Sequence, residues 1–126
     1  MTRRQGEQVV LHVYDLGDNT WLYPFGLGAY HSGVVAFGRE FTFSRSGVFD
    51  TRPRDVPAPF RVAVPLGVFM GSSREFRDAV ADVARDFAPG TYDLYRKNCN
   101  CFSDALCRRL FATGIPAWVN RSAHAP

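Results

Sequence analysis

Several features are scarce in this chain of 126 residues, and each scarcity excludes a class of protein. Its 3 cysteines, Cys99, Cys101 and Cys107, are too few and too tightly clustered for a disulfide framework, which favours a reducing compartment. No apolar run is long enough for a signal peptide or a membrane-spanning helix. We therefore expect a soluble protein of the cytoplasm, or of the cytoplasm and the nucleus, with no transmembrane segment.

Lysine is scarce too, because Lys97 is the one lysine among 15 basic residues. The arginines are scattered between Arg3 and Arg121 in runs no longer than two, so the chain lacks the basic stripe of a nucleic-acid-binding protein. We expect the charged residues behind the formal net charge of +3 to lie on a solvated surface, and we expect no nucleic-acid partner.

The sequence also lacks internal repeats, low-complexity segments and interdomain linkers. With 46% hydrophobic residues and 11 phenylalanines, a chain of this length can bury one core but is too short for two domains. A single domain is therefore expected over residues 1–126, with its core between residues 9 and 121 and short flexible ends.

The first half of the chain has the composition of β-strands. Val9 to Leu16 is rich in β-branched residues, which predicts a buried strand with His12 packed on a mixed face. Residues 60–68 alternate apolar and polar side chains, which predicts another strand that Pro65 either ends or confines to a sheet edge. The proline- and charge-rich residues 46–59 predict a surface loop.

A β-hairpin is predicted around the turn Gly38-Arg39. Residues 31–37 and 40–46 have the pattern of its two strands, with Phe37 opposite Glu40. Directly opposed residues share a sheet face. His31 is therefore expected on the more polar face, beside a glycine that leaves room for another group to approach; its companions on that face are Gly33, Thr42 and Ser44.

Two main helices are predicted in the second half of the chain. Ser72 and Glu75 match a capping box, and apolar residues follow at helical spacing. A second helix is expected to start after Asn98, a favourable N-cap. This mixture predicts an α+β domain in which a small antiparallel sheet packs on two main helices. The C-terminal segment is expected to dock through two apolar residues, Ile115 and Trp118.

The stretch Lys97-Asn98-Cys99-Asn100-Cys101-Phe102-Ser103-Asp104 places a cysteine at the first position of the second helix. The free N–H groups and the positive dipole of a helix N-terminus stabilise a thiolate, which is the nucleophilic form of cysteine. The same groups can hold a developing oxyanion. Such a thiol also needs a base. Of the three histidines, His31 has the most suitable setting; the others are His12 and His124.

Three interpretations of the cysteine cluster are open from the residues alone. A shared metal ion is disfavoured, because in a helix Cys99 and Cys101 point about 200° apart and Cys99 and Cys107 lie about 12 Å apart along the axis. The spacing also misses the usual zinc patterns. Idle buried thiols are the second interpretation, which suits Cys107 better than Cys99. A Cys-His nucleophile pair is the third.

Four stretches of the chain resemble the PPPDE family, the desumoylating isopeptidases and related deubiquitinases. The resemblance runs from about Val9 to Arg121 and keeps the motifs in the order of the family. Ser46-Gly47-Val48-Phe49 and Lys97-Asn98-Cys99-Asn100 look closer to the deubiquitinase-like branch, because the founding desumoylating branch carries histidine before Asn-Cys-Asn. The four stretches are residues 10–16, 31–41, 97–103 and 115–121.

The resemblance implies a circularly permuted papain-like fold, in which the histidine strand precedes the cysteine helix. It implies that Cys99 is the nucleophile and His31 the general base and acid of a cysteine isopeptidase. The substrates would be conjugates of ubiquitin or of a ubiquitin-like modifier such as SUMO, and neither a cofactor nor a metal is implied. Papain-like enzymes normally orient the histidine with a third polar residue, which stays open between Thr42, Ser44 and Glu40.

Two other functions stay open. One is a thioesterase that removes acyl chains from protein cysteines, suggested by the aromatic loop Trp21 to Tyr30 and by the resemblance of Asn-Cys-x-x-Phe to lipid acyltransferases with a related permuted fold. The other is a non-catalytic module that binds ubiquitin-like proteins and in which Cys99 is idle. A homodimer stays open as well.

Overall fold

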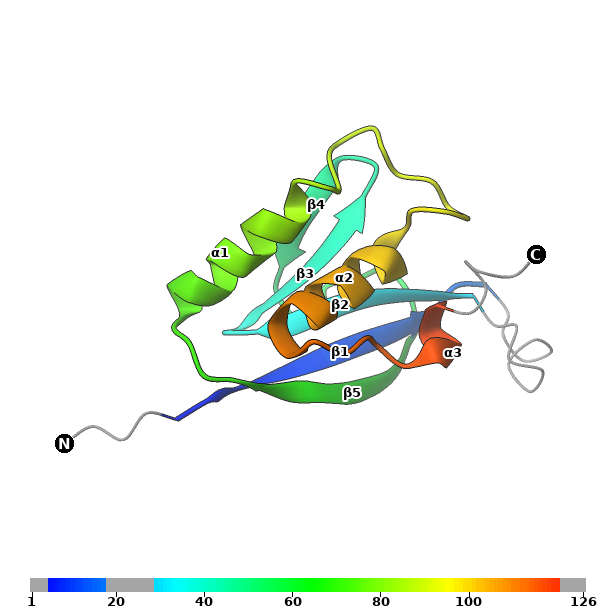
Figure 1. The fold of residues 1–126 in the computed structure, drawn as a ribbon. Helices are drawn as coiled ribbons and strands as arrows, with labels where there is room; N and C mark the ends of the chain where they lie inside the picture. The colour runs from blue at the N-terminus through cyan, green and yellow to red at the C-terminus, as the bar shows by residue number, and fades with distance from the viewer. Residues whose placement is uncertain (1–4, 18–28, 121–126) are drawn as a thin grey trace.

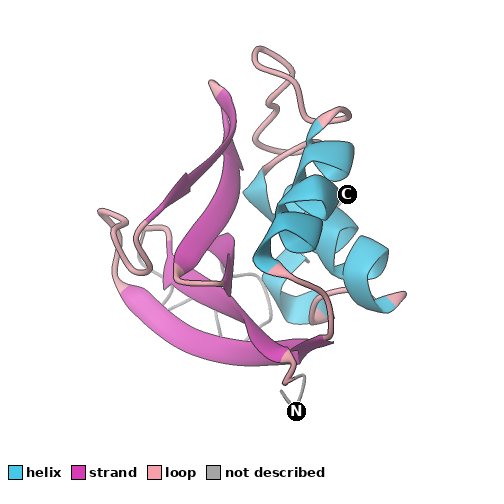
Figure 2. Cartoon of the chain, turned by 90° about the vertical axis from the view of Figure 1, so that its left-hand side faces the viewer, coloured by secondary structure: helices cyan, strands magenta, loops and turns pink. Residues whose placement is uncertain are grey.

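The computed structural model describes residues 5–17 and 29–120, which form two layers, a sheet on one side and helices on the other (Figures 1 and 2). The sheet has five antiparallel strands in the order β4-β3-β2-β1-β5. In chain order the strands are β1 (Glu7–Asp15), β2 (Tyr30–Ala36), β3 (Arg39–Ser44), β4 (Gly47–Thr51) and β5 (Phe60–Phe69). The helices are α1 (Ser73–Ala84), α2 (Cys99–Phe111) and the short α3 (Ala117–Asn120).

This architecture confirms the predicted α+β class. The two longer helices, α1 and α2, lie on the same face of the sheet (Figure 2). The strand that carries His31, β2, precedes the helix that begins with Cys99. The order of elements is therefore compatible with a permuted papain-like fold.

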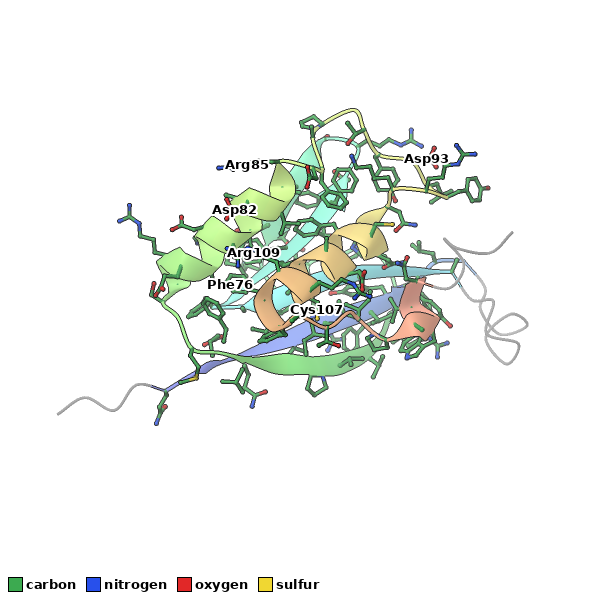
Figure 3. All side chains as sticks on the ribbon, in the orientation of Figure 1. Phe76, Asp82, Arg85, Asp93, Cys107 and Arg109 are labelled. Carbon is green, nitrogen blue, oxygen red and sulfur yellow. The ribbon has the colours of Figure 1, made fainter. Side chains whose placement is uncertain are left out.

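The core fills the space between the two layers. Fully burying a large apolar side chain contributes about 1.5 to 3 kcal/mol each to folding, so this layer supplies most of the stability that holds the site in place. On the surface, Arg109 of α2 and Asp82 of α1 approach to 3.4 Å and join the helices, but as an exposed pair they contribute little (Figure 3). The buried apolar residues include Leu11, Val13, Val34, Phe41, Phe43, Phe76, Phe102 and Leu106.

Both helix starts have the predicted caps. The Ser72 hydroxyl accepts a hydrogen bond from the Glu75 amide, and the Glu75 carboxylate accepts one from the Ser72 amide, which completes the capping box. At α2, the Asn98 side-chain oxygen accepts from the amides of Asn100 (3.0 Å) and Cys101 (3.1 Å). Cys99 is therefore the first helical residue, as predicted.

The predicted docking of the C-terminal segment is also confirmed. Ile115 is buried, and the Trp118 ring packs edge-to-face on Tyr30 of β2 with the ring centroids 5.1 Å apart. Because Tyr30 directly precedes His31, this contact helps to fix the start of the histidine strand.

The predicted hairpin exists, but its register is wrong by two residues. The turn is Phe37-Gly38, and Val35 rather than Phe37 lies opposite Glu40. Both turn residues have positive φ, 53° and 74°, as a two-residue type I′ hairpin turn requires. A shift of two keeps the faces unchanged, so His31 still shares its face with Gly33, Thr42 and Ser44.

The predicted loop over residues 46–59 is wrong in its first part, since Gly47–Thr51 forms the edge strand β4. The local sequence signal for a strand is weak here, because the segment is short and lies next to a proline- and charge-rich stretch. The strand forms because it pairs with β3. At the other edge, β5 contains Pro65 next to a register irregularity in its pairing with β1, which confirms the edge placement. Within residues 5–17 and 29–120, no helix has the length and hydropathy needed to cross a membrane.

Candidate active site

Cys99 lies at the N-terminus of α2, pressed against strand β2. Its side chain is nearly enclosed, with 3% of its surface exposed. The backbone amide of Ser32 faces the thiol and interacts with it, as do the amides of Asn100 and of Cys99 itself. The helix N-terminus and the strand therefore both direct N–H groups at the sulfur.

Asn100 anchors this end of α2 to the histidine strand. Its side-chain nitrogen donates to the carbonyl oxygens of Tyr30 (2.9 Å) and Val119 (3.2 Å), and its side-chain oxygen accepts from the Ser32 hydroxyl at 2.7 Å. The Ser32 hydroxyl also interacts with the Ser103 hydroxyl at 2.8 Å. These buried hydrogen bonds fix the position of the thiol relative to β2.

His31 directly precedes Ser32, so its backbone lies next to the strand position whose amide faces the Cys99 thiol. Side chains alternate along a strand, and because Ser32 faces α2, the His31 imidazole extends toward the other face of the sheet. There it lies against the Tyr14 ring, with centroids 5.6 Å apart, and lines a hollow of about 190 Å³ together with Glu40 and Thr42. Among the described residues, no hydrogen bond joins the imidazole to the thiol.

Burial disfavours the charged form of both groups. Burial raises the pKa of the Cys99 thiol to about 11, although the surrounding backbone amides act in the opposite direction. Burial also lowers the pKa of the His31 imidazole, which the negative charge of Glu40 only partly offsets. The sequence predicted that the helix N-terminus favours a thiolate; the N–H groups do lower the pKa of the thiol, but desolvation has the larger effect in the opposite direction.

Tyr92, in the segment that connects α1 to α2, also reaches the thiol. The Tyr92 hydroxyl interacts with the Cys99 side chain and with its backbone amide, while its ring packs against Phe43 at 5.3 Å. The amides of Asn100 and Cys101 are occupied by the Asn98 cap. The Cys99 amide is therefore the N–H group at this helix start that a substrate oxygen can take over by displacing the tyrosine hydroxyl.

The pH dependence of kcat/KM follows from these two pKa values. If a neutral His31 imidazole is the base that accepts the thiol proton, activity should fall as the pH drops through the lowered pKa of His31, below 6.5. The thiol deprotonates only near pH 11, so activity should stay level from pH 7 to beyond pH 9. A pH–rate profile with a substrate that turns over slowly measures both limbs. A fall in activity between pH 8 and 9 would indicate a preformed thiolate–imidazolium pair instead.

The sequence did not indicate how Glu40 is used. It is almost fully buried, and its carboxylate accepts hydrogen bonds from Tyr14 and from His12, which extend from β1 on the same face. His12 was expected only to pack on a mixed face. The one available signal was Gly33. It has no side chain, so it leaves space on the sheet face that Glu40 shares.

The other two cysteines lie away from the Cys99 thiol. Cys107 is buried in the core on α2 (Figure 3), and Cys101, six residues before it, is partly exposed. All three thiols are free. Residues 5–17 and 29–120 contain no group of three or more His, Cys, Asp or Glu side chains that could hold a metal. His124 and residues 18–28 of the aromatic loop lie outside the described part of the chain.

A second hollow, of about 250 Å³, opens beside the cap of α2. Tyr95 at its rim is 72% exposed and Leu94 is 55% exposed, so two adjacent large apolar side chains lie open to a partner here. Its floor is more polar, because Asn98 and Asn100 lie there next to Cys99. The lining residues are Leu16, Ala29, Tyr30, Leu94, Tyr95, Asn98 and Asn100.

An α+β domain with a cysteine at a helix N-terminus, packed against a strand that carries a histidine, is compatible with a cysteine peptidase. Comparison with known proteins agrees with this class. Residues 7–126 match the profile described as the PPPDE putative peptidase domain, and the chain belongs to this family.

The curated relatives carry names from the same family. A DeSI-like protein of Arabidopsis thaliana is 39% identical over 91% of this chain and 54% of its own length. A desumoylating isopeptidase 1 homolog of Caenorhabditis elegans is 33% identical over 98% of this chain and 40% of its own length. Human desumoylating isopeptidase 1 is 28% identical over 88% of this chain and 71% of its own length. The chain thus spans about half the length of the first two relatives, and its family is one of cysteine isopeptidases.

Proposed function

We propose that this protein is a cysteine isopeptidase that removes a ubiquitin-like modifier from lysine side chains, with Cys99 as nucleophile and His31 as general base and acid. The observation that carries the proposal is the position of the Cys99 thiol, at the N-terminus of α2 and against the amide that follows His31. The names of the relatives add the substrate class, since several are desumoylating isopeptidases.

The first half of the reaction transfers the modifier to the protein. As the Cys99 sulfur attacks the carbonyl carbon of the isopeptide bond, the neutral His31 imidazole accepts the thiol proton. The carbonyl oxygen becomes negatively charged and takes a hydrogen bond from the Cys99 amide. When the carbon–nitrogen bond breaks, His31 gives its proton to the departing lysine nitrogen, and the modifier remains as a thioester.

The second half restores the protein. The oxygen of a water molecule attacks the thioester while His31 accepts a proton from that water. His31 then gives this proton to the sulfur, which leaves as a thiol. The modifier departs as a carboxylic acid, which releases its proton to the solvent at neutral pH. The high pKa of the resting thiol suits this scheme, because the sulfur need not carry a charge until the substrate is in place.

The hollow beside Asn98 is where we place the tail of the modifier. The tail of a ubiquitin-like protein is a narrow extended strand that ends in glycine, and an apolar rim with polar groups at the far end suits such a segment. Leu94 and Tyr95 flank the hollow and lie a few residues before Cys99 in the chain. A strand that enters between them would reach Asn98 and Asn100, the two residues that flank Cys99 in the chain.

Changing Tyr95 to serine should therefore weaken modifier binding. We expect KM for a modifier conjugate to rise about 10-fold, as loss of an aromatic anchor at an interface commonly does, while hydrolysis of a small activated thioester stays unchanged. Steady-state kinetics with the two substrates measures this. The exposed Met70, far along the chain from α2, provides a matched control as Met70→Ser. An equal loss with both substrates would mean that Tyr95 supports the site itself rather than the modifier.

Incubation with defined conjugates tests the function. Purified protein is mixed with a lysine-linked SUMO conjugate, a lysine-linked ubiquitin conjugate and an S-acylated peptide, and the products are separated by gel and mass spectrometry. Release of a free modifier from at least one lysine conjugate is the expected result. Cleavage of the S-acyl peptide alone would replace the isopeptidase by a thioesterase, and binding without cleavage would indicate a non-catalytic module.

The proposal includes the location of the protein. Its three free thiols are compatible with a reducing compartment, and conjugates of ubiquitin-like modifiers would be met in the cytoplasm and nucleus. Fractionation of cells that express the tagged chain tests this part.

A further inference from the structure

We propose that Glu40 is a positioning residue for His31: its buried carboxylate, held over Gly33 by Tyr14 and His12, stabilises the imidazole while it carries the proton between thiol and leaving amine. This inference rests on the proposed function. It assigns a role to a buried acid that the catalytic steps do not themselves use.

Glu40 is an unusual residue for its surroundings. It is 1% exposed, and burying a carboxylate is costly unless hydrogen bonds replace the lost water. The Tyr14 hydroxyl donates to both carboxylate oxygens, at 2.9 and 2.8 Å, His12 Nδ1 donates to Oε1 at 2.9 Å, and the Arg54 amide donates to Oε1 at 3.1 Å. Three groups from two other segments thus hold one carboxylate in a fixed place.

The carboxylate is held on the side of His31. Glu40 lies opposite Val35 in the sheet, and its side chain runs back along the strand over Gly33, which is two residues after His31 on the same face. A Cβ added at Gly33 would lie 2.6 Å from Glu40 Oε2, so the glycine is needed for the carboxylate to lie there. Glu40 and His31 line the same hollow, and the Tyr14 ring lies against the imidazole.

The charge of this carboxylate reaches His31. Burial disfavours a charged imidazole, and Glu40 is the charged group that counteracts this effect by raising the pKa of His31. No arginine or lysine side chain of the described residues forms an ion pair with Glu40 within 4 Å, and His12 is its partner on β1. Because the general acid and base must become an imidazolium in both halves of the reaction, a fixed negative charge beside it lowers the barrier.

The other candidates for this role are engaged elsewhere. The Thr42 hydroxyl donates to the Ser32 carbonyl oxygen at 2.8 Å, and the Ser44 hydroxyl lies near Gly47 at the hairpin end of the strand. Asp55 lines the same hollow as His31, but it is exposed, so water screens its charge. The Arg54 guanidinium packs over the Phe60 ring, 3.9 Å from its centroid, rather than against Glu40.

The test compares Glu40→Gln with Asp55→Asn, which removes a negative charge from the exposed side of the hollow. For Glu40→Gln we expect kcat to fall about 10- to 100-fold with KM unchanged, in line with the effect of one nearby charge on an ionisable group. Glu40→Asp, which keeps the charge, should recover part of this loss, and Asp55→Asn should change kcat less than about 2-fold.

The second readout needs no substrate. The His31 ring signals, followed by NMR as a function of pH, should titrate at a lower pH in Glu40→Gln than in the wild type. A Glu40→Gln protein with unchanged kcat and an unchanged His31 titration would overturn the inference. If the wild type cleaves no conjugate but the titration still shifts, the proposed function fails while the link between Glu40 and His31 holds.

If Glu40→Gln does not fold, Tyr14→Phe can replace it in the test. Tyr14→Phe keeps the buried ring and removes the hydroxyl that donates to both carboxylate oxygens. With the carboxylate less firmly held, kcat should fall about 3- to 10-fold without a change in KM, the range expected when one hydrogen bond is lost. A kcat equal to that of the wild type would count against the role of Glu40.

Discussion

Cys99→Ala should abolish isopeptide cleavage, with a loss of at least about 10⁴-fold in kcat/KM. Removing the nucleophile leaves only binding and the oxyanion-stabilising amide, and such remnants retain a small part of the activity in enzymes that use a catalytic nucleophile. In free-energy terms this is about 5.5 kcal/mol of transition-state stabilisation. The substitution keeps a small apolar side chain at a buried position, so the protein should fold.

Cys101 is the matched control for this variant. It lies two residues further along α2, is partly exposed, and its sulfur lies near the Arg96 carbonyl oxygen at 3.7 Å rather than near β2. Cys101→Ser should retain the activity of the wild type, as measured with the same conjugate. If Cys99→Ala retained cleavage, or Cys101→Ser lost it, the nucleophile would be wrongly assigned.

His31→Ala should lower kcat by about 10²- to 10⁴-fold, which is the usual contribution of a general acid–base residue. The expected effect is large because the resting thiol has a pKa of about 11, so almost none of it is ionised at neutral pH without a base. KM should change little, because His31 does not line the hollow that we assign to the modifier. Stopped-flow measurement of a single turnover separates this chemical step from product release.

A chemical rescue distinguishes loss of the base from loss of structure. In His31→Gly, free imidazole in the buffer can occupy the space beside Tyr14 and should restore part of the activity in proportion to its concentration. The far-UV circular dichroism and melting temperature of both variants should remain close to those of the wild type. Unfolding of both variants, or a lack of rescue with an intact fold, would contradict the assignment of His31 as the base.

The elements with strong local signals were predictable from the sequence. The capping box at Ser72 and the Asn98 cap determine where α1 and α2 begin, because a side chain within a few residues satisfies the free amides at each start. The faces of β2 and β3 followed from alternation alone. The same local rules placed Cys99 at a helix N-terminus.

Features that depend on distant residues were not predictable in this way. The register of the hairpin depends on Phe37 adopting a positive φ, which is rare outside glycine and gives no sequence signal. Strand β4 forms because β3 offers it an edge. The high pKa of Cys99 comes from burial against Ser32, and the environment of Glu40 from side chains on β1, 26 and 28 positions away along the chain.

The most direct test of the account is the reaction of the protein with modifiers that carry an electrophile in place of their C-terminal carboxylate. Probes based on SUMO and on ubiquitin are each incubated with the wild type, Cys99→Ser and Cys101→Ser, and the adducts are mapped by peptide mass spectrometry. The account predicts a one-to-one adduct on Cys99 with at least one probe, absent in Cys99→Ser and unchanged in Cys101→Ser. An adduct on Cys101 or Cys107, or no adduct with any modifier probe, would contradict it.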